Sequence, residues 1–180
     1  LSGQVCIDGH DLRTLSQDSI GRHVSMVLQE PFLFSGTIFE NIRYASVTKN
    51  LADVERAAQV VGAHDFIARL PGDYQFVLDQ GGGNLSLGQR QLISFARALV
   101  ADTRILVLDE ATANVDSYSE RKIQRALNIL LEGRTAIVIA HRLATIRDCD
   151  RILVLNHGRL AEEGSHQELM EIDGLYARLC

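Results

Sequence analysis

A short apolar run that ends in two acids constrains the fold of this chain more than any other stretch. Residues 105–108 read Ile-Leu-Val-Leu, and Asp109 and Glu110 come directly after them. An apolar run without alternation predicts a strand buried on both faces, as in the parallel sheet of an α/β protein. Two carboxylates at the end of such a strand are costly unless they bind a metal or take part in chemistry.

The position of these acids at a strand end predicts what they bind. In open α/β sheets, ligands bind at the carboxyl ends of parallel strands. We therefore predict a site for phosphate and Mg²⁺, because Mg²⁺ prefers oxygen ligands and phosphate groups. Asp109 is the predicted metal ligand, and Glu110 is available as a base. The alternative is that both acids only stabilise the start of a following helix.

A helix is predicted before this strand, and its start has the features of an anion site. Residues 81–88 form a polar loop that contains several glycines, and apolar residues then recur at steps of three and four. These apolar residues are Leu92, Ile93, Ala96, Leu99 and Val100. Ser86 lies where a hydroxyl can cap the first N–H groups of the helix. Open N–H groups and the helix dipole together favour negative charge there.

Three motifs in this stretch resemble those of one protein family, the ABC ATPases. Residues 84–89, Asn-Leu-Ser-Leu-Gly-Gln, resemble the signature loop, with Leu87 where the family often has glycine. Residues 105–110 resemble the Walker B strand with its catalytic glutamate, and residues 113–116, Ala-Asn-Val-Asp, resemble the D-loop. The chain thus resembles the nucleotide-binding domain of an ABC transporter of the exporter type.

The resemblance implies an α/β fold with two parts. It implies a P-loop NTPase (RecA-like) core of mainly parallel sheet at residues 1–37 and 102–180, with an inserted helical subdomain at about 38–101. The family's phosphate-binding loop, G-x-x-x-x-G-K-[ST], does not occur in this sequence. The sequence therefore resembles a domain without its first strand, phosphate loop and first helix. We expect these 180 residues alone to bind ATP weakly and to lack activity.

Two further polar residues follow predicted strands and match positions of the family. Gln29 comes after the predicted strand at 24–28, and His141 comes after the one at 135–139. By itself, each residue is readily explained as an ordinary polar group at a turn or surface. The resemblance implies that Gln29 helps to bind Mg²⁺ and senses the γ-phosphate. It also implies that His141 is the switch histidine, which hydrogen-bonds to the γ-phosphate.

The resemblance joins these residues into a site that hydrolyses ATP with Mg²⁺. The first acid of the Walker B strand would bind Mg²⁺, and the second would orient and deprotonate the attacking water. Because the family binds ATP between two such domains, the signature loop faces a nucleotide held by a second domain, identical or different. The residues implied at that contact are Ser86, Gly88, Gln89 and, in the D-loop, Asp116.

Apolar residues after Gln29 predict a surface that contacts a partner. Phe32, Leu33 and Phe34 lie in a segment that resembles the one following the Q-loop in exporters. There, apolar residues meet the coupling helices of the membrane domain. Exposed apolar clusters mark interfaces, but burial of the same residues in the core is nearly as well supported. Gln80 stands where exporters of the family often carry an acid.

Composition and charge narrow the remaining choices. The net charge of −5 argues against a nucleic-acid binder driven by bulk charge. No apolar run approaches the roughly 18 residues that a membrane span needs. By resemblance, the expected location is the cytoplasmic face of a membrane, in the first instance the bacterial inner membrane. The alternatives are a soluble ABC-type ATPase and a non-catalytic module whose assembly is regulated by nucleotide.

Local signals predict the secondary structure of the rest of the chain. Helices are expected at 51–61, 65–70 and 117–131, the first capped by Asn50 and the last opened by a Ser-Tyr-Ser-Glu capping box. Residues 151–163 predict a hairpin with a short turn. A second capping box, from Ser165 to Glu168, predicts a C-terminal helix.

Overall fold

The computed structural model describes residues 3–109, 117–140 and 143–180. The chain divides into two compact units, Leu1–Val138 and Ile139–Cys180, which we call the first and second unit and describe separately. This boundary differs from the predicted division into core and helical subdomain, which stays a prediction. Among the described residues, no helix has the length and apolar character needed to cross a membrane.

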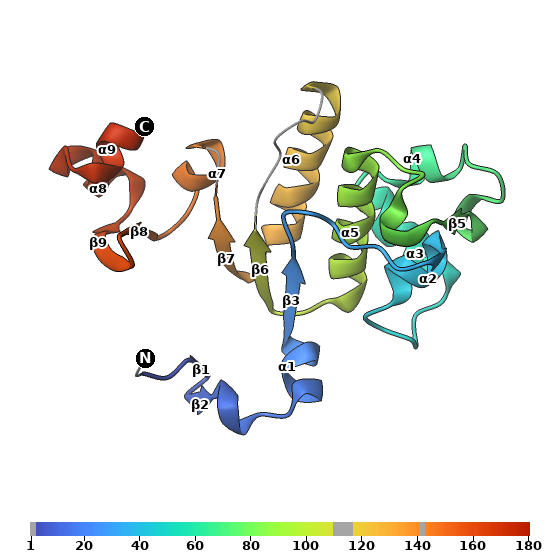
Figure 1. The fold of residues 1–180 in the computed structure, drawn as a ribbon, viewed down its shortest axis with the longest axis horizontal. Helices are drawn as coiled ribbons and strands as arrows, with labels where there is room; N and C mark the ends of the chain where they lie inside the picture. Colours follow the sequence, from blue (N-terminus) through green and yellow to red (C-terminus); the bar gives the residue numbers. More distant parts are fainter. Residues whose placement is uncertain (1–2, 110–116, 141–142) are drawn as a thin grey trace. The chain divides into compact units, whose positions relative to one another are not determined.

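A three-stranded sheet organises the first unit. Its order is β3 (Val24–Val27), β6 (Ile105–Asp109) and β7 (Thr135–Ile139). Strands β3 and β6 are parallel, with Val24 opposite Ile105 and Val27 opposite Leu108. Figure 1 shows the three arrows pointing the same way. The predicted α/β fold with a parallel sheet is therefore confirmed.

The prediction that the 105–108 strand is buried on both faces is wrong for this structure. Leu106 and Leu108 are buried at 1% and 2% exposure, whereas Ile105 and Val107 between them are only half-buried. The buried pair packs into a core formed with α5 (Leu87–Ala101) and α6 (Ser117–Leu131). Burial alternates because these helices cover the face of the sheet that carries Leu106 and Leu108.

Helix α5 is the central element of the first unit. It packs against β3, α6, α2 (Ile38–Arg43) and α3 (Leu51–Val60). Figure 1 shows it between the sheet and the group formed by α2, α3 and α4 (His64–Ile67). Because neighbours surround it, even Gln91 and Ser94 in its middle are buried. The position of α5 lets it connect the sheet to the helical group.

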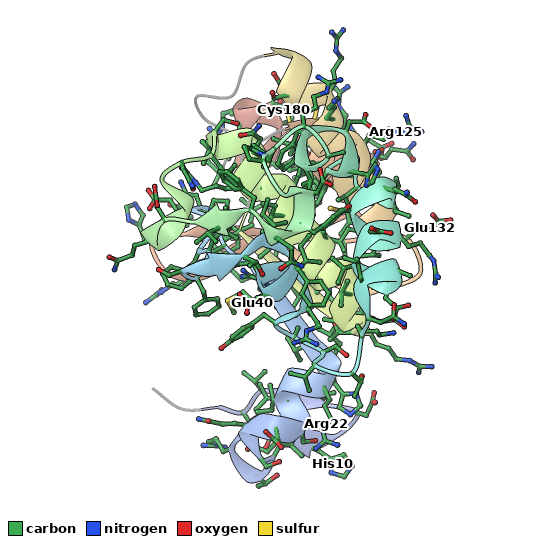
Figure 2. The ribbon with its side chains drawn as sticks, turned by 90° about the vertical axis from the view of Figure 1, so that its right-hand side faces the viewer. His10, Arg22, Glu40, Arg125, Glu132 and Cys180 are labelled. Atoms are coloured by element: carbon green, nitrogen blue, oxygen red, sulfur yellow. The ribbon has the colours of Figure 1, made fainter. Side chains whose placement is uncertain are left out.

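Helix α6 covers the sheet with one apolar stripe. Ile123, Ala126, Leu127 and Leu130 are buried at the spacing of one helical face. The outward side carries charged residues, and Arg125 projects away from the helix in Figure 2, as does Glu132 just beyond its end. The predicted bounds of this helix, 117–131, are confirmed.

Short elements complete the first unit. In the described part of the chain they are two short strand pairs, one short helix and three 3₁₀ turns. These elements are β1 (Cys6–Ile7), β2 (His10–Asp11), α1 (Gln17–His23), β4 (Gly36–Thr37), β5 (Val77–Leu78), η1 (Leu12–Thr14), η2 (Asp73–Gln75) and η3 (Gln80–Gly82). β1 pairs with β2 and β4 pairs with β5, both antiparallel.

The helix predicted at 65–70 is shorter than expected. Helix α4 ends at Ile67, and the next residues form tight turns, in which the N–H of Leu70 donates to the carbonyl of Ile67. Pro71 follows, and Gly72 has a φ of +80°. A proline and a left-handed glycine cannot continue a helix, so the chain turns before the predicted end.

The second unit is a hairpin with small helices packed on it. Strands β8 (Ile152–Asn156) and β9 (Arg159–Gly164) pair antiparallel, as predicted, with an irregularity in register between Val154 and Leu155. Helices α8 (His166–Ile172) and α9 (Leu175–Leu179) follow, and α7 (Leu143–Arg147) precedes them. Val154, Leu169 and Tyr176 form the small buried core.

Candidate functional site

The predicted anion site lies at the first turn of α5. Ser86 is the N-cap, and its hydroxyl oxygen accepts a hydrogen bond from the N–H of Gln89 at 3.2 Å. In return, the Gln89 side-chain oxygen accepts from the N–H of Ser86 at 2.9 Å. Gly88 is buried within the same turn. The three signature residues that the sequence predicts at a nucleotide are therefore brought together in one capped turn.

The loop before this turn is held by hydrogen bonds of its own. The Asn84 side chain donates to the carbonyl of Val77 at 3.0 Å and accepts from the N–H of Asp79 at 3.2 Å. Arg90 of α5 donates back to the carbonyl of Leu85 at 3.0 Å. These bonds fix the loop on both sides of Ser86, so the turn is positioned before any ligand arrives.

Gly82 is required in this loop by two independent features. Its φ is +70°, a conformation that side chains disfavour. A Cβ at this position would also lie 2.9 Å from Cδ1 of Leu33 and 3.0 Å from Cδ of Arg90. Gly81 has a φ of +68°, whereas Gly83 has a negative φ. Gly81 and Gly82 thus supply the positive-φ turns of this loop.

Two oxygen-bearing side chains lie at one end of the parallel strands. Asp109 is the last residue of β6 and is half-buried. Gln29 comes two residues after the end of β3 and is exposed. Because Val27 lies opposite Leu108 in a parallel register, both side chains belong to the carboxyl end of the sheet. A carboxylate and an amide oxygen at this end are suitable ligands for Mg²⁺ beside a phosphate.

The remaining predicted site residues lie outside the described part of the chain. Glu110, Asp116 and His141 fall in the ranges 110–116 and 141–142, of which the structure gives no account. Their predicted roles stay predictions. The structure therefore describes five of the residues assigned to nucleotide or metal. These are Gln29, Ser86, Gly88, Gln89 and Asp109.

The structure separates the three residues of the predicted partner surface. Phe32 is 55% exposed and Phe34 is half-buried, whereas Leu33 is fully buried in the core of the first unit. The expectation of a surface role is therefore wrong for Leu33. Its side chain turns inward, where it packs toward Gly82 and belongs to the core of the first unit.

Tyr44 joins the two phenylalanines and was missed by sequence reasoning. The Phe32 and Phe34 rings meet edge to face at 5.0 Å, and Tyr44 stacks on Phe34 at 4.3 Å. Tyr44 is 60% exposed. Its position directly after α2, which begins just past the Phe32 segment, was the available signal. We call Phe32, Phe34 and Tyr44 the aromatic surface.

The fold and the site together define the class of this protein. A parallel sheet with acidic and amide side chains at its carboxyl end, and a capped helix start preceded by a fixed glycine turn, belongs to the P-loop NTPase fold. The family model for ABC transporters matches residues 1–113. The chain belongs to the ABC transporter family.

Similar proteins agree with this assignment. The chain is 53% identical over 177 residues to the uncharacterized ABC transporter ATP-binding protein YknV of Bacillus subtilis, covering 98% of this chain and 29% of that protein. It is 46% identical over 177 residues to the ATP-dependent lipid A-core flippase of Desulfotalea psychrophila, covering 98% of this chain and 31% of the flippase. It is 47% identical to the leptomycin B resistance protein pmd1 of Schizosaccharomyces pombe, covering 99% and 14% respectively.

A solved structure shows the same fold. A bacterial Atm1-family ABC exporter with ATP bound superposes with a TM-score of 0.89 at 43% identity, covering 99% of this chain and 31% of that one. The chain spans less than a third of the length of these relatives.

Proposed function

We propose that this chain is part of the ATP-hydrolysing domain of an ABC exporter, which couples ATP hydrolysis to transport across a membrane. The observation that carries the proposal is the capped signature turn at the start of α5 in the same unit as the Gln29 and Asp109 strand ends. The names of the relatives support it, since they include a flippase, a resistance protein and an exporter with ATP bound.

Within this proposal, ATP and Mg²⁺ are the ligands at the carboxyl end of the sheet. Asp109 and Gln29 would hold Mg²⁺, which neutralises charge on the phosphate oxygens when bound. Glu110 would orient and deprotonate the attacking water, and His141 would hydrogen-bond to the γ-phosphate. By the same proposal, the 180 residues by themselves do not turn ATP over.

The signature turn would serve a nucleotide held by a second nucleotide-binding domain. The Ser86 hydroxyl accepts from the Gln89 N–H, so its own proton points away from that bond and can be donated to a phosphate oxygen. The helix dipole adds favourable potential for an anion at the same place. Gly88 lets a phosphate approach the backbone, and Asp116 would complete this contact.

The partner on the membrane side would be the cytoplasmic coupling segments of the membrane-spanning part. Phe32 and Phe34 support this proposal, because they expose apolar surface at one place on the first unit. Leu33 would act from beneath, as core packing for the segment. The expected location is the cytoplasmic face of a membrane, the bacterial inner membrane in the first instance.

The test of the proposal uses the complete protein. Changing Glu110→Gln should abolish ATP turnover while ATP stays bound, because the water loses its base and the phosphate contacts remain. Release of inorganic phosphate and retention of radiolabelled ATP are the two measurements. Glu132→Gln is the matched control, since Glu132 is an exposed carboxylate near the end of α6. Hydrolysis that continues in Glu110→Gln would contradict the assignment of the base.

A further inference from the structure

Arg97 of α5 reaches across to a segment far away in the sequence. Its Nη1 donates to the carbonyl of Phe32 at 2.9 Å, and its Nε donates to the carbonyl of Asn41 at 2.8 Å. Its Nη2 donates to Oδ1 of Asn41 at 3.0 Å. The planar fork of a guanidinium can satisfy three such acceptors at once, which a lysine ammonium on a flexible stem does not reproduce.

The environment of this guanidinium is unusual for a charge. All three hydrogen-bond acceptors are neutral oxygens, and the rings of Phe34 and Tyr44 lie 5.5 Å and 5.8 Å from its central carbon. Burial lowers the pKa of Arg97 from its ordinary value. Placing a cation there costs desolvation energy, which only well-formed hydrogen bonds and ring contacts offset. The contacts of Arg97 are thus specific rather than incidental.

Asn41 extends the connection to the rest of the segment. It is 1% exposed, its side-chain nitrogen donates to the carbonyl of Phe34 at 2.9 Å, and its Oδ1 accepts from the N–H of Phe34 at 2.9 Å. Arg97 and Asn41 therefore hold the main chain at both phenylalanines of the aromatic surface. Because these bonds have defined directions, the aromatic surface cannot slide along α5 without breaking several of them.

The same helix begins at the signature turn. Arg97 lies on α5, whose N-cap is Ser86, and a continuous helix moves as a rigid element. A second contact runs in parallel, since Leu33 packs on Gly82 just before that turn. The aromatic surface is thus connected to the elements on both sides of Ser86, by hydrogen bonds to α5 and by packing on the loop before the turn.

We propose that Arg97 is a positioning residue that locks the aromatic surface to α5, so that the bound membrane-side partner sets the position of the signature turn. This inference rests on the proposed function. In this proposal Arg97 does not contact the nucleotide. Its role is to act through the turn at Ser86, and its loss should affect turnover rather than ATP affinity.

The experiment measures kcat and KM for Mg-ATP in the complete exporter reconstituted in phospholipid vesicles. Arg97→Lys keeps the charge and most of the stem but loses the fork. We expect kcat per folded molecule to fall about tenfold, because small misplacements of a catalytic group are costly, with KM within about twofold. Arg125→Lys is the control, since Arg125 is exposed on α6, and its kcat should equal that of the wild type.

A double variant tests whether Arg97 acts through the aromatic surface. Phe32→Ala should also lower kcat, and Arg97→Lys combined with Phe32→Ala should be no slower than the slower single variant, because both break one connection. Losses that multiply would overturn the proposal. So would an Arg97→Lys protein with a lowered melting temperature but a normal kcat per folded molecule, which indicates a purely structural role.

Two further outcomes keep the test decisive. If Arg97→Lys does not fold, Tyr44→Leu removes an exposed ring from beside the guanidinium, and an unchanged kcat in that variant overturns the proposal. If the wild-type complete protein does not hydrolyse ATP at all, the proposed function fails, and the positioning role that rests on it falls with it.

Discussion

The helical part of the first unit, residues 36–101, and the second unit use the same local devices on cores of different size. Each has a helix opened by a capping box, at Ser86 and at Ser165. Each also has a histidine bonded to a tyrosine ten residues later, and both Nδ1–Oη distances are 2.8 Å. These pairs are His64 with Tyr74 and His166 with Tyr176.

The cores of the two regions differ widely. The cluster of the first unit extends from Val27 to Leu130 and includes residues of every long helix, whereas that of the second unit is built on Val154, Leu169 and Tyr176. Apolar burial is the dominant favourable term in folding, while a cap or a single hydrogen bond contributes about 1 kcal/mol. The two regions should therefore differ in stability although they share the same capping boxes and histidine–tyrosine pairs. Matched substitutions in the two regions can test this.

The largest expected effects come from core truncation. Ile93 and Leu169 are both 0% exposed, in the first and second unit respectively. Ile93→Ala should cost about 2–5 kcal/mol of unfolding free energy in the large cluster. Leu169→Ala should instead open the second unit locally, because few other apolar residues remain to hold it. Hydrogen exchange read by mass spectrometry on the complete protein separates the two, and protection lost throughout the chain in Leu169→Ala would break the comparison.

Removing the caps should have smaller and similar effects in both regions. Ser86→Ala and Ser165→Ala each leave the N–H of the third helical residue without its side-chain acceptor. We expect each to cost about 1 kcal/mol. Chemical denaturation followed by circular dichroism gives the total, and exchange of the Gln89 and Glu168 amides localises it. A cost several times larger at Ser86 would show that the cap also supports the packing of α5.

The two tyrosines predict a shared response to alkaline pH. Burial is the main cause that raises the pKa of both Tyr74 and Tyr176 to about 12. Since an unfolded tyrosine ionises near pH 10, the unfolded state loses its proton first, and stability should fall as pH rises from about 10 toward 12. Tyr74→Phe and Tyr176→Phe should each remove part of this slope. Ultraviolet titration of the phenolate measures the pKa of each tyrosine, and a pKa near 10 for either one would contradict the prediction.

The smallest effects are expected at acidic pH. Backbone N–H groups of Thr37 and Ser165 donate to Glu40 and Glu168 and lower the pKa of these carboxyl groups below the ordinary value. Their contribution is present above the ordinary glutamate pKa, and it is lost as pH falls through the lowered one. Carbon-13 NMR titration of Glu40, at the surface in Figure 2, and of Glu168 checks this. Glu40→Gln and Glu168→Gln keep an oxygen acceptor and should remove the pH dependence.

The sequence predicted well whatever depends on near neighbours. The cap at Ser86, the box at Ser165 and the hairpin after Arg151 are local patterns, and the structure contains all three. A mainly parallel sheet also followed from an apolar run and the family resemblance, although the pairing of β3 with β6 was not predicted. The short helix at His64 shows the limit, since its end was set by turns that apolar spacing does not reveal.

Features that depend on distant residues could not be predicted from the sequence. Leu33 and Phe32 look alike as apolar neighbours, but Gly82 and the core decide that one is buried and the other exposed. Arg97 contacts Phe32 and Asn41 across more than fifty residues, and no local sequence pattern predicts that contact. Of the predicted site, Gln29 and Asp109 could be placed after strands because strand ends are local, while their position at the same end of the sheet required the register of β3 and β6.

The three-stranded sheet exposes apolar side chains in the described part of the chain, and this has a practical consequence for handling it. Met26 and Ile137 are 61% and 59% exposed, and Leu28 is 46% exposed. Apolar side chains that a β-sheet exposes to solvent promote aggregation at high protein concentration. A preparation of these 180 residues should thus lose solubility as it is concentrated, and polar replacement of Met26 and Ile137 should delay the onset of light scattering.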